Sequence, residues 1–295
     1  MIIVIGLNLI PTALDMTGVT QIASGDKNTI VSVIIATITL TIVLAIKKFN
    51  KGFLSQVAIL IAVVIGYVIS LALGQVSTTE IQNASLIAIP SFTLPKFDMG
   101  AIAIIAPVIL AVFMEHVGDI TTNGEVVGKN FIEEPGLNRT LLGDGVATLV
   151  AGLIGGPANT TYGENTGVLA MTKNYNPAIL RLTAVFAILL SFIAKFGAVI
   201  RTIPQSVMGG ISLILFSMIA IVGFKTIKRE KVEFNIFNII VMASILIVGL
   251  SSNFLPNAIS IQITETVSIS GLSLAAIVGV VLNIILTKLS KVKNK

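Results

Sequence analysis

The stretch from Pro157 to Lys173, P-A-N-T-T-Y-G-E-N-T-G-V-L-A-M-T-K, interrupts a series of apolar segments that are long enough to span a bilayer. Gly155 and Gly156, followed by Pro157, break any helix that arrives from Leu149. The chain therefore predicts a helix that stops inside an apolar region.

The residues after this break predict a short extended segment and then a second helix. Residues 159–162 favour an extended backbone, and Gly163 permits the turn into a helix that ends near Thr172. A break at membrane depth leaves backbone N–H and C=O groups that only protein, ligand or water in a cavity can satisfy. The first turn of the second helix, with Glu164, would direct free N–H groups at that cavity. This pattern indicates a binding site; a Gly-Pro loop at the membrane surface is the alternative.

Composition places the chain in a membrane. Of 295 residues, 55% are hydrophobic and only 11% are charged, unlike a soluble domain. No cysteine is present, so the sequence excludes disulfides and thiolate metal sites. The net charge of +5 comes from basic loops between apolar runs, which is a topology signal and argues against nucleic acid as a partner.

Apolar runs recur near the length of about 20 residues that crosses about 30 Å of hydrocarbon. Short basic loops, including Lys47, Lys48 and Lys51, are expected in the cytoplasm. The predicted fold class is an all-α polytopic membrane protein with spans at 29–46, 53–73, 100–123, 141–154, 178–194, 207–224, 234–250 and 271–286.

One predicted span carries two acids on a single helical face. Glu115, Asp119, Thr122 and Asn123 are spaced i, i+4, i+7 and i+8. A charge at the bilayer centre costs about 2.5 to 3.5 kcal/mol, so this stripe should face protein or water. The alternative places Asp119 and the residues beyond it in the headgroup region.

The single histidine, His116, lies about 100° from this stripe and is expected to be a packing residue. With no second histidine and no cysteine, a metal site is not expected. The sequence also indicates no cofactor. An intramembrane enzyme would need a nucleophile, metal or cofactor motif beside the acids, and none accompanies them, so we expect the chain not to be an enzyme.

The motif E-N-T-G-V-L-A-M-T-K from Glu164 to Lys173 resembles the signature of the nucleobase/ascorbate transporter (nucleobase:cation symporter) family. Its signature positions in this chain are Asn165, Gly167 and Thr172. Other motifs resemble the bacterial uracil permeases of this family in the same order: M-E-H-V-G-D at 114–119, P-G-L at 135–137, L-G-D-G at 142–145, and the run 204–210.

The resemblance implies an inverted-repeat fold of about fourteen segments in two sets of seven, with a core and a gate domain. Residues 1–99 would be a partial gate-domain half with the end of the fifth segment and the sixth and seventh. Residues 100–203 would be a core-domain half holding segments eight to eleven and the substrate site, with a short strand at 159–162. Residues 204–295 would be the second gate-domain half. The first four segments would be missing, so an N-terminal truncation is expected.

The resemblance also implies roles for individual residues. Glu115 and Glu164 would hold the base, a backbone N–H of Gly163 or Glu164 would reach a ring carbonyl, and Tyr162 would border the pocket. Glutamate at 164, where family members for xanthine or urate tend to carry glutamine, favours uracil. Because an apolar cavity disfavours a charged carboxyl, Glu115 or Asp119 is expected to carry the coupled proton.

The function implied is import of uracil, or a closely related nucleobase, by proton symport across the cytoplasmic membrane. The expected partners are the nucleobase, protons and the lipid bilayer, with a homodimer through the gate domain implied by the family. Two alternatives are a truncated form that does not transport and a purine permease for xanthine or urate.

Overall fold

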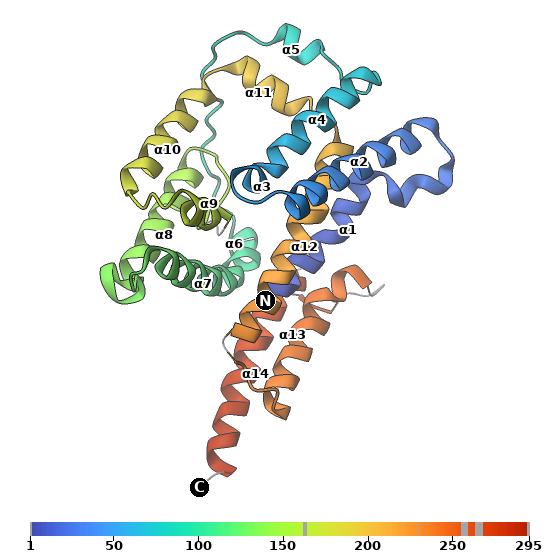
Figure 1. Ribbon diagram of the computed structural model, residues 1–295. Coiled ribbons are helices and arrows are strands. Elements are labelled where there is room, and N and C mark those ends of the chain that lie inside the picture. Colours follow the sequence, from blue (N-terminus) through green and yellow to red (C-terminus); the bar gives the residue numbers. More distant parts are fainter. Residues whose placement is uncertain (1, 162–163, 230, 255–258, 263–267, 294–295) are drawn as a thin grey trace.

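Helices account for most of the structure, a computed structural model that describes residues 2–161, 164–229, 231–254, 259–262 and 268–293 (Figure 1). In this part of the chain four helical spans are long and apolar enough to cross a membrane, at 27–49, 99–127, 205–228 and 271–288. A fifth is counted if α10 (Pro177–Ser191) and α11 (Ala194–Arg201), which meet at an 86° bend, form one span. These helices indicate that the chain is an integral membrane protein.

The N-terminal third forms a bundle around the long helix α12 (Gln205–Arg229). Its elements are α1 (Ile2–Thr17), η1 (Val19–Ser24), α2 (Lys27–Phe49), α3 (Phe53–Gln56) and α4 (Ala58–Ala72), whereas α5 (Thr79–Asn83) lies against α11. The predicted span 53–73 is thus divided between α3 and α4. Figure 1 shows α1 running beside α12, and α2 and α4 also pack on α12. One buried core joins α2, α4 and α12, with Val43, Ala58, Ala62 and Ile214.

Glycine residues allow the backbones of α1 and α12 to come into direct contact. A Cβ atom on Gly6 would lie 2.6 Å from the backbone nitrogen of Ala220, and one on Gly223 would lie 2.9 Å from the backbone nitrogen of Ile3. Such small-residue contacts are a common way for helices to associate in a membrane, where burial of apolar side chains supplies little driving force.

The middle of the chain contains the helices that carry the predicted site. These are α6 (Met99–Ile105), η2 (Ala106–Val108), α7 (Ile109–Val127), η3 (Ile132–Gly136), α8 (Leu137–Leu153) and α9 (Glu164–Thr172). Asp98 caps α6 by accepting a 2.9 Å hydrogen bond from the backbone nitrogen of Ala101. In Figure 1, α7, α8 and α9 form a green group to one side of α12.

The C-terminal part consists of α13 (Ile236–Phe254), two short strands and α14 (Gly271–Lys293). The strands β1 (Ser260–Gln262) and β2 (Ser268–Ser270) pair antiparallel. The fold is therefore predominantly helical, as predicted, but a small hairpin precedes the last helix. Asn8 of α1 makes two hydrogen bonds to α13. Its Nδ2 donates to the Gly249 carbonyl at 2.7 Å, and its Oδ1 accepts from Asn253 at 2.8 Å.

The short strand predicted at 159–162 is wrong for its described part, residues 159–161, which have no regular secondary structure. A strand needs a neighbouring backbone to pair with, and no described segment pairs with these residues. They bond to α8 instead. The hydroxyl proton of Thr148 is shared between the carbonyl and the Oδ1 atom of Asn159, each 2.8 Å away, and Thr160 donates to Asp144 at 3.1 Å.

Candidate functional site

The acidic stripe predicted on one helix face lines a cavity of about 460 Å³ between α7 and α12. Its α7 wall is formed by Met114, Glu115, Gly118, Asp119 and Thr122. The i, i+4 spacing of Glu115 and Asp119 directs both toward the same side, and both are half-buried. The two acids therefore lie on one face of α7, and this face lines the cavity.

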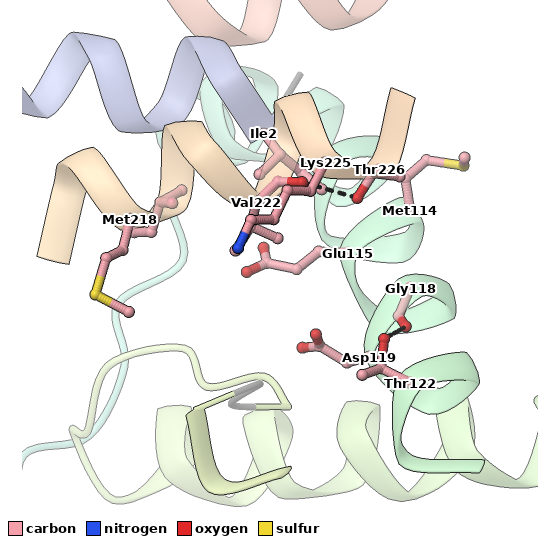
Figure 2. A pocket seen from close by; sticks show the side chains of 11 residues that line it. Ile2, Met114, Glu115, Gly118, Asp119, Thr122, Met218, Val222, Lys225 and Thr226 are labelled. Carbon is pink, nitrogen blue, oxygen red and sulfur yellow. Dashed lines mark hydrogen bonds between the residues drawn. The ribbon is translucent and has the colours of Figure 1, made fainter. Parts of the chain in front are cut away.

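The opposite wall comes mainly from the last turns of α12. It includes Met218, Val222, Lys225 and Thr226, which repeat at i, i+4, i+7 and i+8, together with Ile2 and Ile219. Figure 2 shows the Glu115 and Asp119 carboxylates pointing into the cavity, with the Lys225 side chain entering the same space from α12. One basic group therefore faces two acidic groups across a largely apolar pocket.

Lys225 is the lining residue that sequence reasoning missed. The basic residues that follow the predicted span 207–224 favour a loop that begins at Lys225. In the structure α12 continues to Arg229, so Lys225 lies inside the helix. Its spacing from Met218 and Val222 is the signal in the sequence that could have placed it on the helix.

The predicted break in the next segment is confirmed. α8 ends at Leu153, Gly155 adopts a left-handed backbone with φ +84°, and α9 begins at Glu164. A Cβ atom at Gly155 would also lie 2.7 Å from the carbonyl oxygen of Thr93, so this turn requires glycine. The second half-helix ends at Thr172, as predicted.

The site residues on the second half-helix are located only in part. Tyr162, Gly163 and the side chain of Glu164 lie outside the described residues. The signature residues Asn165, Gly167 and Thr172 all belong to α9, with Asn165 and Thr172 exposed.

A buried contact brings α9 against the acidic helix. Thr166, only 4% exposed, donates a 2.6 Å hydrogen bond to Oδ1 of Asn123 in α7. Asn123 follows Asp119 by one turn, and Thr166 follows Glu164 by two residues. The contact therefore joins the start of α9 to the end of the acidic stripe, a role for Asn123 that the stripe pattern does not predict.

His116 is buried, at 2% exposed, as expected of a packing residue, but its surroundings are polar. Its Nε2 lies 3.0 Å from Oγ1 of Thr140, and its Nδ1 lies 3.0 Å from Oγ1 of Thr161 and 3.2 Å from Oδ2 of Asp144. The ring thus joins α7, α8 and the segment before α9. Sequence spacing alone could not find this, because the partners come from two other segments, α8 and the residues before α9.

The arrangement suits a small, polar, planar molecule. The cavity volume falls in the range of about 300 to 1,000 Å³ usual for small-molecule sites. Carboxylates accept hydrogen bonds and lysine donates them, so one ligand with both N–H and C=O groups could be satisfied from the two walls.

Comparison with known proteins identifies the family. A family described as the Permease family matches residues 1–258. The chain belongs to this permease family. A permease moves solutes across a membrane, so the prediction that the chain is not an enzyme is confirmed by the family, and the resemblance drawn from the signature motif is confirmed with it.

Several curated members of the family are similar over nearly the whole chain. A probable uracil permease of Haemophilus influenzae is 38% identical over 292 residues, covering 97% of this chain and 67% of the relative. The uracil permease of Escherichia coli strain K12 is 38% identical over 288 residues, covering 97% and 65%. The uracil permease of Bacillus subtilis strain 168 is 39% identical over 297 residues, covering 97% and 66%. The chain spans about two thirds of the length of these relatives.

Proposed function

We propose that this permease-family chain takes part in importing uracil, or a closely related nucleobase, by proton symport across the cell membrane. The observation that carries the proposal is the pair of carboxylates, Glu115 and Asp119, that face one cavity from a helix long and apolar enough to span a membrane. Ionisable groups inside a membrane are costly and usually mark a substrate or ion pathway. The curated relatives named as uracil permeases supply the substrate class.

The chemistry of uracil complements this cavity. The base is neutral and planar, with two N–H donors and two carbonyl acceptors, so a carboxylate can accept from a ring N–H group. Glu115 would supply that carboxylate from α7, and Glu164 a second from the first turn of α9. Free N–H groups at Gly163 or Glu164 would donate to a ring carbonyl, and Tyr162 would border the base.

Selectivity follows from the same groups. A base without a matching N–H donor would leave a buried acceptor unpaired, at a cost of about 1 to 3 kcal/mol. Glutamate at 164, where members of the family for xanthine or urate tend to carry glutamine, would favour uracil over these two purines.

Proton coupling would use one carboxyl in the cavity. An apolar environment disfavours the charged carboxyl, which can then take up a proton on one side of the membrane and release it on the other. Glu115 and Asp119 are the two candidates, since both line the pocket.

The packing of helices supports the division into a core part at 100–203 and gate parts at 1–99 and 204–295. α12 packs against α1, α2 and α4, whereas α7 packs against α8 and α9. The cavity lies between α7 and α12, so movement of one part against the other would open or close it.

The test is uptake of labelled uracil by cells that lack their own uracil permease and express this chain, at acidic and alkaline external pH. Saturable uptake that strengthens at acid pH, and that unlabelled uracil inhibits better than xanthine or urate, supports the proposal. In the same assay, Glu115→Gln should reduce uptake. Its matched control is Glu125→Gln, which changes an exposed acid on the same helix. Stronger inhibition by xanthine would indicate a purine permease. No uptake, with the protein in the membrane, would indicate a form that does not transport.

A further inference from the structure

His116 follows Glu115 directly, yet its ring points away from the cavity and into a buried set of polar groups. The groups come from Thr140 and Asp144 on α8 and from Thr161 in the segment that leads into α9. Thr161 is separated from Glu164 by only two residues. The imidazole therefore links the acidic helix to the segment that would present the second carboxylate and the free N–H groups.

Hydrogen-bond donors and acceptors fix the direction of the bond at Nε2. The single hydroxyl proton of Thr140 is donated to the Leu137 carbonyl at 3.0 Å. Its oxygen must then accept from His116, so Nε2 carries a proton.

On the other side of the ring, Nδ1 lies 3.2 Å from Oδ2 of Asp144, which also accepts from Thr160 at 3.1 Å. Nδ1 also lies 3.0 Å from Oγ1 of Thr161, so this side of the ring contacts both Asp144 and the segment before α9. Both ring nitrogens are thereby occupied.

We propose that His116 is a positioning residue for substrate binding. Its Nδ1 side, shared with Asp144, holds Thr160 and Thr161 in place, and so orients the backbone that enters α9. His116 is not one of the residues that line the cavity in the described part of the chain, so it acts through this segment and not on the base itself. This inference rests on the proposed function, in which residues 162–164 bind the nucleobase.

Two replacements separate the two sides of the ring. The amide of asparagine can occupy the position of Nδ1, whereas the longer glutamine side chain places its amide near the position of Nε2. His116→Asn therefore keeps a partner for Asp144 and Thr161, and His116→Gln keeps a partner for Thr140. A role confined to packing would instead favour His116→Gln, because glutamine is closer to histidine in volume.

The experiment measures uracil affinity and backbone hydrogen–deuterium exchange of the purified full chain and both variants. We expect His116→Asn to bind within about 3-fold of the unaltered chain. We expect His116→Gln to bind at least about 10-fold more weakly, equivalent to about 1.4 kcal/mol and typical of one lost hydrogen bond. Exchange in residues 157–161 should rise in His116→Gln alone.

If the histidine variants do not fold, Thr161→Val and Thr140→Val provide the same contrast, because valine matches threonine in shape and removes one hydroxyl. Thr161→Val should weaken binding and speed exchange at 157–161, and Thr140→Val should change either by less than about 2-fold. Equal losses in each pair, or no change in exchange, would overturn the inference. If the unaltered chain does not bind uracil, the proposed function fails, while the exchange data still decide whether His116 holds the segment.

Discussion

Thr166 in α9 donates a 2.6 Å hydrogen bond to Oδ1 of Asn123 in α7, and the threonine is 4% exposed. The bond joins the helix that carries the acidic stripe to the helix that begins with Glu164. In a membrane interior such a polar contact between helices holds two segments in one register. The two proposed carboxylates thus belong to helices that are directly bonded to each other.

Breaking this contact should loosen the site. Thr166→Val removes the hydroxyl donor and leaves Oδ1 of Asn123 without this hydrogen bond. We therefore expect the free energy of unfolding to fall by about 0.6 to 2 kcal/mol and uracil binding to weaken. Thermal unfolding and uracil affinity in detergent measure both effects. Thr183→Val is the matched control, because Thr183 is exposed and donates only to the Ile179 carbonyl of its own helix. Equal effects of the two variants would show that the interhelical bond contributes nothing.

Replacing Glu164 with glutamine should change which base is bound. The glutamine amide carries an N–H donor at the position where the Glu164 carboxylate would accept from a ring N–H of uracil. We therefore expect Glu164→Gln to lose or alter base selectivity while still inserting in the membrane. Competition of uracil, xanthine and urate for labelled uracil, alongside membrane localisation, measures this. Normal uracil uptake by the variant, with unchanged selectivity, would contradict the assignment of Glu164 to the site.

Asp119→Asn should separate proton coupling from base binding. Asparagine keeps the size of the side chain but cannot release a proton, so uptake should lose its increase at acid pH while uracil still binds. Glu115→Gln should reduce binding and uptake together, because Glu115 is also a proposed ligand. Uptake against external pH, with affinity measured separately, distinguishes the two. Retained acid stimulation in Asp119→Asn would assign the proton to Glu115.

Gly155→Ala should destabilise the break between α8 and α9. The position has φ +84°, and a Cβ atom there would meet the backbone of Thr93, so we expect a cost of more than about 1 kcal/mol. Gly152→Ala is the control, since Gly152 is helical and a Cβ atom there meets nothing within 4 Å. Alanine at 152 should stabilise by about 0.5 to 1 kcal/mol. Thermal unfolding compares them, and a neutral Gly155→Ala would show that the turn tolerates another conformation.

Local backbone preference is a property that the sequence determines by itself. Gly155 and Gly156 weaken a helix and Pro157 breaks it, so the end of α8 follows from these residue types. The i, i+4 spacing of Glu115 and Asp119 likewise places both acids on one face, because helical periodicity belongs to a single segment. The family signature falls on α9, which follows the break after α8.

Contacts between distant segments were decided only by the tertiary structure. A helix pattern says which face is polar but not which helix lies opposite, so the position of Lys225 across from Glu115 and Asp119 could not be derived. The 86° bend between α10 and α11 is hidden for a related reason, since an apolar run such as 178–194 does not reveal where its helix turns. His116 shows both contributions. Its spacing in the sequence indicates a residue off the acidic stripe. Only the packing of α8 and the segment before α9 against its ring places it in a buried polar network.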